Sequence, residues 1–376
     1  MKIAVISTPV FKVPVAGYSG LEHLAWLTAK GLAEKGHDVT LVAPEGSECP
    51  GVKMVTPGPE GTWDEKTFYG KYWQILPEFD VIIDETWQKW SYILKGEGRL
   101  NAPILGVCHA PVNTMYGSLP PGVDKPCFVC ISRDQAAHFE ALHSRPARVA
   151  YNGVDMDFYK PLGVPRSDRF LFLARFSTIK GPDLAIQACK RVGCGLDLIG
   201  DTSITGEPEF LERCKKMCDS WVESNGSVGG SMGGNAKLFK TPEDMIANQD
   251  KMIRLVGPAK RGETVWWFSQ AHCLLHPNQR FREPFGLAPV EAMACGCPVI
   301  AWDNGAMRET IKNGETGWLV RSMDEMVLAV ETYSKIGWIT DITREKCREW
   351  ASQFSLPKMI DRYEELINEA VDTGGW

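Results

Sequence analysis

Short runs of apolar, often β-branched residues alternate along this chain with longer segments in which apolar residues recur every three or four positions. The first short run is 2–7, and a helical spacing follows it with Leu21, Leu24 and Leu32. A second short run occupies 39–42. Runs of this length predict buried strands, and the segment between them predicts a helix. The order strand, helix, strand predicts a right-handed unit with parallel strands.

The same alternation continues through the first half of the chain. Further strands are predicted at 81–83, 104–107, 128–131 and 148–151. Ser132 stands directly before a segment that begins at Arg133, and serine is a favoured helix N-cap. We therefore expect a helix to begin at Arg133 and the first half to form one open parallel sheet.

A proline-punctuated segment at 159–165 contains few apolar residues and predicts a hinge between two domains. The alternation then restarts, with strands predicted at 170–174, 196–199, 252–256, 273–275 and 298–301 and helices at 182–191 and 287–294. The fold class is therefore α/β, with two Rossmann-like doubly wound domains. Such domains place ligands at the carboxyl ends of their strands, so we expect the site in a cleft that both domains face.

Residues 201–250 interrupt this pattern. The stretch 220–234 is rich in glycine and serine and predicts a mobile surface loop rather than a packed element, with a lid or acceptor loop as the alternative. It is not a phosphate-binding P-loop, because no Gly-Lys-Ser/Thr follows the glycines. The tail 358–370 has apolar residues at helical spacing and should dock as a helix.

Length and composition limit the class of protein. The 376 residues suggest two domains, and 44% hydrophobic content excludes disorder as the main theme. The net charge is −6, and acidic residues outnumber basic ones in both halves, so neither half offers a basic surface for nucleic acid. No apolar stretch approaches the roughly 18 residues that would predict a membrane span.

The cysteines and the N-terminus point to a cytoplasmic protein. The first residues, MKIAVIS, lack the apolar length of a signal peptide, and twelve cysteines without such a signal predict reduced thiols. Cys127 and Cys130 form a Cys-x-x-Cys motif, which also occurs in redox pairs and zinc sites. The pair spans a predicted strand and no second Cys-x-x-Cys is present, so we expect buried structural thiols.

The clearest candidate chemistry lies between Glu283 and Glu291. Glu283 falls in a predicted loop, where a carboxylate can accept hydrogen bonds from sugar hydroxyls. The amides around Gly286 and Leu287 begin the predicted helix and suit an anionic phosphate. Glu291 lies further along that helix, where it could reach a ribose diol. Taken alone, each glutamate would be interpreted as an ordinary charge flanking a helix.

Basic and imidazole side chains follow other predicted strands. Arg175 and Lys180 come directly after the strand 170–174, where they would face a diphosphate, although a solvated turn explains them in isolation. His109 follows the strand 104–107 at its carboxyl end. A lone histidine is more often structural, but this position favours contact with substrate.

Together these segments resemble the retaining nucleotide-sugar glycosyltransferases of family 4, which have the GT-B fold. The resemblance rests on the Glu-x7-Glu block with its Glu-Pro-Phe-Gly and Cys-Pro-Val-Ile context, and on Arg175 with Lys180. It also rests on Asn-Gly-Val-Asp at 152–155 and on the glycine-containing loop 17–20 with Gly-His-Asp-Val-Thr at 36–40. It covers nearly the whole chain, with 220–250 as the least similar part.

The resemblance implies a role for each matching residue. In the family the basic pair binds the donor diphosphate, the first glutamate contacts the transferred sugar and the second contacts the ribose. His109 resembles the family's active-site histidine, which contacts the donor sugar and the acceptor. The implied donor-binding residues are Gly20, Arg175, Lys180, Glu283, Phe285, Gly286, Leu287 and Glu291, and the implied catalytic residues are His109, Arg175, Lys180 and Glu283.

Three features depart from the family or need a separate reading. Ser19 precedes Gly20 where adjacent glycines are common, and the seven residues 276–282 replace a short Pro-Ser step. Asp155 and Asp157 form an Asp-x-Asp, the metal motif of the other glycosyltransferase fold, but they lie in the Asn-Gly-Val-Asp segment and should be structural. No metal or other cofactor is expected, because cations and helix-start amides can neutralise the leaving diphosphate.

We therefore expect an N-terminal acceptor domain at 1–158, a C-terminal donor domain at 159–355, and a helix at 356–376 that crosses back to the first domain. The expected activity is metal-independent, retaining transfer of a hexosyl unit from a UDP- or GDP-linked sugar to a hydroxyl acceptor. The acceptor class stays open between small molecule, glycan and lipid-linked compound, as does peripheral membrane contact. The alternatives are an idle sugar-nucleotide-binding protein and a phosphorylase or epimerase on the same scaffold. A nicotinamide dehydrogenase is disfavoured because no Gly-x-Gly-x-x-Gly follows the first strand.

Overall fold

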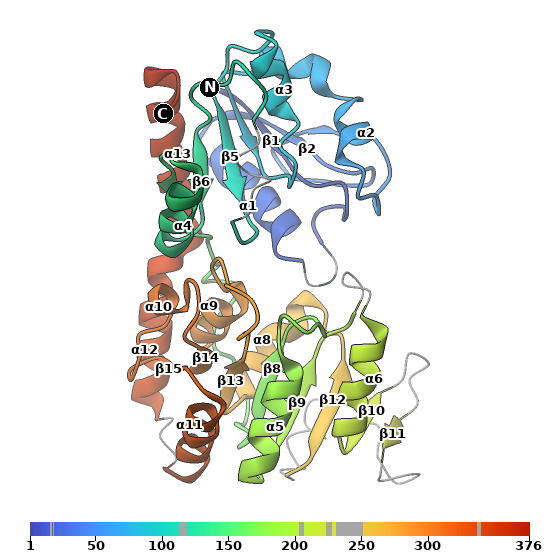
Figure 1. The fold of residues 1–376 in the computed structure, drawn as a ribbon, viewed down its shortest axis with the longest axis vertical. Coiled ribbons are helices and arrows are strands. Elements are labelled where there is room, and N and C mark those ends of the chain that lie inside the picture. The colour runs from blue at the N-terminus through green and yellow to red at the C-terminus, as the bar shows by residue number, and fades with distance from the viewer. Residues whose placement is uncertain are drawn as a thin grey trace. The chain divides into compact units, whose positions relative to one another are not determined.

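The computed structural model describes residues 1–15, 17, 19–112, 119–202, 207–222, 228–230, 251–336 and 340–376. The chain divides into two units (Figure 1). Unit 1 consists of Met1–Gly153 together with Phe354–Trp376, and unit 2 consists of Val154–Gln353. The division therefore falls at residues 153 and 354, against the expected boundaries at 158 and 356.

Unit 1 is built on a seven-stranded sheet in the order β3-β2-β1-β4-β5-β6-β7, with every adjacent pair parallel. Its strands are β1 (Lys2–Ile6), β2 (Asp38–Val42), β3 (Lys53–Val55), β4 (Val81–Asp84), β5 (Ile104–Cys108), β6 (Phe128–Cys130) and β7 (Arg148–Val149). Its helices are α1 (Leu21–Glu34), α2 (Glu65–Tyr69), η1 (Trp73–Glu78), α3 (Ser91–Gly96), α4 (Arg133–His143) and α13 (Leu356–Thr373).

Unit 2 is built on an eight-stranded sheet in the order β11-β10-β12-β9-β8-β13-β14-β15, parallel except for the pair β10–β11. Its strands are β8 (Phe170–Leu173), β9 (Leu196–Ile199), β10 (Ser220–Val222), β11 (Val228–Gly230), β12 (Ile253–Gly257), β13 (Cys273–His276), β14 (Val299–Trp302) and β15 (Gly317–Val320). Its helices are α5 (Pro182–Val192), α6 (Pro208–Met217), α8 (Arg261–Gln270), α9 (Leu287–Ala294), α10 (Met307–Thr310), α11 (Met323–Ile336) and α12 (Asp341–Ala351), and η2 (Ser352–Phe354) follows α12.

The predicted elements are largely confirmed. Helix α9 has the predicted bounds 287–294. Helix α4 begins at Arg133, and the Ser132 hydroxyl accepts a hydrogen bond from the Gln135 amide at 3.1 Å, as expected for an N-cap. The α/β fold class with two doubly wound sheets is also confirmed.

The prediction of an unpacked loop over 220–234 is wrong in part. Strand β10 pairs with β12 in parallel and with β11 in antiparallel register, so this stretch adds two strands to the edge of the sheet. Each strand has only three residues, too few for a periodicity signal, and the pairing of β10 with β12 and of β11 with β10 supplies what the sequence pattern lacks. The alternative of a lid or acceptor loop over 220–234 also involves 223–227 and 231–234, which lie outside the described residues.

Helix α13 packs on unit 1, where it contacts α1 and β5. Its buried face consists of Met359, Ile360, Tyr363, Leu366, Ile367 and Ala370. Gly31 of α1 permits the close approach, because a Cβ atom there would lie 2.5 Å from the Ile360 side chain. The two helices therefore meet through a small residue on one and a branched residue on the other.

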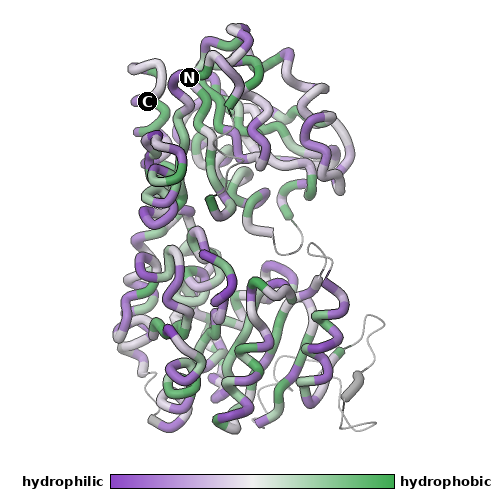
Figure 2. The backbone as a smooth tube through the Cα atoms, viewed as in Figure 1, coloured by the Kyte–Doolittle hydropathy of each residue, from purple (hydrophilic) through white to green (hydrophobic). Residues whose placement is uncertain are grey.

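The cores of both units follow their strands. Figure 2 shows hydrophobic segments along the sheets of both units, with hydrophilic stretches on the covering helices. All twelve cysteines are free and buried, which confirms that Cys127 and Cys130 are buried thiols, and burial raises the pKa of Cys127. Among the described helices, none has the length and apolar character that a membrane crossing requires.

Candidate functional site

The carboxylate of Glu283 is the centre of a buried polar cluster in unit 2. Glu283 lies in the loop between β13 and α9 and is 8% exposed. Its Oε2 atom accepts hydrogen bonds from Lys180 Nζ at 2.6 Å and from Asn278 Nδ2 at 3.2 Å. His276 Nε2 lies 3.4 Å from the same oxygen. The structure therefore brings together Lys180 and Glu283, which are 103 residues apart in the sequence.

Electrostatics keep this carboxylate ionised. Burial alone would raise the pKa of Glu283, but the positive charge of Lys180 and the contact with His276 outweigh it and hold the pKa below its usual range. Burial lowers the pKa of His276, although Glu283 opposes this shift. Near neutral pH the cluster therefore contains an anionic glutamate and a neutral imidazole, with Lys180 as the cation that compensates Glu283.

The backbone of Glu283 is held by the loop that follows β14. The Ala306 amide donates to the Glu283 carbonyl at 2.9 Å. Gly305 has φ +61°, and a Cβ atom at this position would lie 2.3 Å from the Glu283 carbonyl oxygen. Only glycine tolerates both the left-handed conformation and this approach. The position of the carboxylate is thus fixed from both its backbone and its side chain.

Helix α9 begins directly beyond this loop. Gly286 is its N-cap with φ +87°, and Phe285 before it is buried. The first amides of a helix have no partner within the helix, and Pro289 has no N–H. The donors at this helix start are therefore the amides of Leu287 and Ala288, a suitable arrangement for an anionic group.

Glu291 lies on α9 and is also buried. Its Oε1 atom is 3.9 Å from the Arg261 guanidinium of α8. Burial raises the pKa of Glu291, and Arg261 and Tyr159 only partly oppose it. The two glutamates of the Glu-x7-Glu block thus have pKa values shifted in opposite directions.

Arg175 and Lys180 both belong to the loop between β8 and α5. Arg175 comes two residues after β8, and its carbonyl accepts a hydrogen bond from the Ser177 amide at 3.0 Å. Lys180 forms an ion pair with Glu283, and its Nζ also lies 4.9 Å from the centre of the Phe281 ring. Phe281 belongs to the seven-residue stretch 276–282, which therefore supplies three of the groups around Lys180 and Glu283: His276, Asn278 and Phe281.

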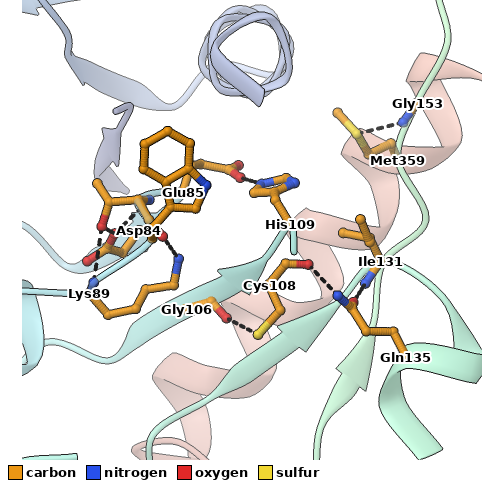
Figure 3. Close-up of polar contacts among 12 residues, drawn as sticks. Asp84, Glu85, Lys89, Gly106, Cys108, His109, Ile131, Gln135, Gly153 and Met359 are labelled. Carbon is orange, nitrogen blue, oxygen red and sulfur yellow. Dashed lines mark hydrogen bonds and ion pairs between the residues drawn. The ribbon is translucent and has the colours of Figure 1, made fainter. Parts of the chain in front are cut away.

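In unit 1, His109 follows the carboxyl end of β5 (Figure 3). Its Nε2 atom forms a buried hydrogen bond with Oε2 of Glu85, the residue after β4. The Gln135 side chain donates to the carbonyls of Cys108 at 2.9 Å and Ala110 at 2.8 Å, one on each side of His109. His109 is therefore held at its side chain by Glu85 and at its main chain by Gln135.

Gly20 is the N-cap of α1, and its carbonyl accepts from the Leu24 amide at 3.0 Å. The buried carboxylate of Glu22 lies in the first turn of α1 and accepts hydrogen bonds from the hydroxyls of Thr8 and Ser19. An acidic side chain is stabilised at a helix N-terminus. The start of α1, where Gly20 lies, thus also holds a buried acidic side chain.

Asp155 has a local structural role. Its Oδ1 atom accepts hydrogen bonds from the amides of Asp157 and Phe158, each at 3.0 Å, and so closes a turn. The described residues contain no group of three or more histidine, cysteine and acidic side chains arranged to hold a metal ion.

Sequence reasoning overlooked Glu85, Gln135 and Asn278, and assigned no role to His276. Glu85 and His276 could have been found, because each stands at the carboxyl end of a predicted strand, where ligands bind in parallel sheets. Gln135 lies in a predicted helix and Asn278 in a predicted loop, and no spacing connects either residue to its partner.

Two doubly wound, mostly parallel sheets with these strand orders define the GT-B fold. Solved structures show the same architecture. Sucrose-phosphate synthase from Thermosynechococcus elongatus matches with a TM-score of 0.75 and 17% identity over 99% of both chains. HepE from Anabaena in complex with UDP-glucose matches with a TM-score of 0.70 and 17% identity, covering 98% of this chain and 100% of HepE.

Family models identify the chain within that fold. Residues 18–158 match the model "Glycosyltransferase Family 4", and residues 228–353 match the model "Glycosyl transferases group 1". Together these regions make up most of the chain. The chain belongs to the family 4 glycosyltransferases, as its motifs predicted.

Curated relatives share part of their length with the chain. D-inositol 3-phosphate glycosyltransferase from Frankia alni is 25% identical over 279 residues, which are 65% of this chain and 63% of the relative. The same enzyme from Jonesia denitrificans is 23% identical over 337 residues, 79% of this chain and 74% of the relative. The chain therefore spans less than two thirds of the Frankia alni relative's length.

Proposed function

We propose that the protein is a retaining glycosyltransferase that moves a hexosyl unit from a UDP- or GDP-linked sugar to a hydroxyl acceptor without a metal ion. The observation that carries this proposal is the cluster of Lys180 and Glu283 directly before the N-terminus of α9. A cation, a hydrogen-bond-accepting carboxylate and helix-start amides are the groups that a diphosphate sugar requires.

Unit 2 binds the donor in this proposal. The amides of Leu287 and Ala288, with Lys180 and Arg175, face the diphosphate and stabilise the negative charge that develops as it leaves. Glu283 stays ionised beside Lys180 and accepts hydrogen bonds from hydroxyls of the transferred sugar. Glu291 on α9 contacts the ribose.

Unit 1 binds the acceptor, and His109 contacts the donor sugar and the acceptor. We infer a displacement on one face of the sugar. The bond between the anomeric carbon and the diphosphate oxygen breaks, the acceptor oxygen bonds to the same face of that carbon, and the acceptor proton passes to the leaving phosphate. The cations and amides stabilise both the leaving group and the oxocarbenium-like sugar beside it.

The similar proteins favour one class of donor but do not narrow the class of acceptor. HepE was solved with UDP-glucose, which favours a uridine diphosphate sugar here. The curated relatives are named for inositol 3-phosphate, which is consistent with a small hydroxylated acceptor. Glycans and lipid-linked acceptors fit the same chemistry.

A thermal-shift panel of nucleoside diphosphate sugars, followed by a transfer assay with NMR detection of the anomeric product, tests the proposal. A bound donor at 100 times its Kd stabilises the protein by about 2.7 kcal/mol, and the melting temperature rises accordingly. We expect this rise with one donor and an anomer-retaining product only when an acceptor is present. Binding without transfer would indicate an idle binding protein. A sugar phosphate or an epimerised donor formed without acceptor would indicate a phosphorylase or an epimerase.

A further inference from the structure

The carboxyl edge of the sheet in unit 1 contains a buried pair whose role the proposed function does not explain. Glu85 is fully buried, and its main-chain amide donates to the Ile6 carbonyl at 3.0 Å, which ties it to the end of β1. One carboxylate oxygen, Oε2, bonds to His109 Nε2. The other oxygen, Oε1, is buried with no hydrogen-bond partner among the described residues. Burying a carboxylate that has only one side-chain partner costs folding free energy. We therefore expect the role of Glu85 to lie in its contact with His109.

The main chain around His109 is fixed separately. Gln135 of α4 donates from Nε2 to the Cys108 carbonyl, while its Oε1 accepts from the Ile131 amide at 2.8 Å (Figure 3). The same Nε2 also donates to the Ala110 carbonyl. All three hydrogen bonds come from one buried amide group. Gln135 therefore holds the main chain on both sides of His109 without Glu85. The hydrogen bond to Glu85 acts on the orientation of the His109 ring.

An imidazole nitrogen that faces a carboxylate must carry the hydrogen. With Nε2 protonated toward Glu85, a neutral His109 has its lone pair on Nδ1. We propose that Glu85 is a positioning residue that fixes the orientation of the His109 ring and its Nε2–H tautomer, so that Nδ1 is the nitrogen presented to substrate. This relation matches the general arrangement in which a carboxylate orients a functional histidine. Only the role of His109 in transfer rests on the proposed function.

Tautomers can be observed directly, without substrate. In protein labelled with ¹⁵N-histidine, two-bond ¹H–¹⁵N correlations distinguish the Nε2–H form from the Nδ1–H form. The variant His109→Gln identifies the His109 signals among the seven histidines. We expect the Nε2–H tautomer in the wild-type protein. An Nδ1–H form in the wild-type protein would overturn the proposal, whatever any variant does.

Glu85→Gln keeps the size of the side chain and removes its charge. Because an amide can donate as well as accept, and neutral bonds are weaker than charge-assisted ones, we expect the tautomer ratio to shift by about tenfold toward Nδ1–H. Glu65→Gln is the matched control. Glu65 is another buried carboxylate of unit 1, but its oxygens accept from the amides of Trp87 and Gln88. The control should leave the His109 signals unchanged.

A transfer assay completes the test. Glu85→Gln should lower kcat. The Kd for UDP, measured by calorimetry, should stay unchanged, because the residues proposed to bind the diphosphate belong to unit 2. Glu85→Asp keeps the charge and should restore the Nε2–H tautomer in part. An unchanged tautomer ratio in folded Glu85→Gln protein contradicts the proposal. A shifted ratio in a protein without transferase activity would leave the positioning role in place and count against the proposed function instead.

Discussion

The buried pair of Lys180 and Glu283 permits a prediction whose size follows from the structure. Their side chains are only 15% and 10% exposed, so solvent screens little of the interaction between the charges 2.6 Å apart. Lys180→Met keeps an apolar stem of similar length but leaves the Glu283 carboxylate buried without its cation. Removing one partner of a buried pair costs about 3–5 kcal/mol, and we expect unit 2 to lose that amount of unfolding free energy.

The matched variants separate the interaction from the loss of each side chain. Glu283→Gln keeps an oxygen that can accept from both Asn278 and Lys180, so its cost should stay near about 1–3 kcal/mol. The double variant should be more stable than Lys180→Met alone, because no unpaired carboxylate remains. The double-mutant cycle should therefore give a coupling energy larger than the cost of Glu283→Gln alone.

Hydrogen exchange followed by mass spectrometry is the suitable assay, because a protein of two units need not unfold in one step. Peptides from β13 and α9 report on unit 2. Because the folded pKa of Glu283 is lowered, its contribution to stability is present above the unfolded value of about 4.3 and is lost as the pH falls through the folded value. The difference between wild type and Lys180→Met should therefore be full at neutral pH and narrow below about pH 4. Additive single variants, or a difference independent of pH, would refute the reasoning.

Three further predictions concern the same site. Gly305→Ala should both destabilise unit 2 and weaken donor binding, because a Cβ atom would lie 2.3 Å from the Glu283 carbonyl oxygen. An unchanged melting temperature and an unchanged Kd for UDP would show that the loop can move to accommodate the added methyl group. Arg175→Ala should reduce kcat with little change in melting temperature, by a barrier increase of about 2–4 kcal/mol if it stabilises the leaving diphosphate; steady-state kinetics check this, and wild-type turnover would exclude the role. Because burial raises the pKa of Glu291, protonation should remove its ribose contact at a higher pH than for an ordinary glutamate. Calorimetry of UDP binding at decreasing pH should therefore show weakening that Glu291→Gln abolishes, and parallel pH profiles would count against the assignment.

Patterns along the chain predicted the elements better than the contacts between them. The bounds of α9 and the N-cap of α4 were predictable because local periodicity, glycine placement and capping chemistry all act within a few residues. The two short strands β10 and β11 were not, since the pairing of β10 with β12 and of β11 with β10 determines them and a three-residue strand has too few positions for a periodic signal.

The site shows the same division. The Glu-x7-Glu motif indicated Glu283, but Asn278 and His276 complete its surroundings through the unusual stretch 276–282. The sequence marks that stretch as different without showing where its side chains point. The Gln135 bonds on either side of His109 depend on the packing of α4 beside β5 and β6, which no spacing between residues 109 and 135 encodes.

The two glutamates of one motif illustrate how surroundings divide similar side chains between different tasks. Both are buried, so desolvation raises the pKa of each. Glu283 has a cation at 2.6 Å, whereas the nearest cation to Glu291 lies at 3.9 Å among the described residues, and attraction falls with distance. The net shifts consequently have opposite signs. Glu283 is suited to remain a hydrogen-bond acceptor beside a departing anion, while Glu291 becomes neutral first as the pH falls. Exchanging their environments, rather than their identities, would exchange these properties.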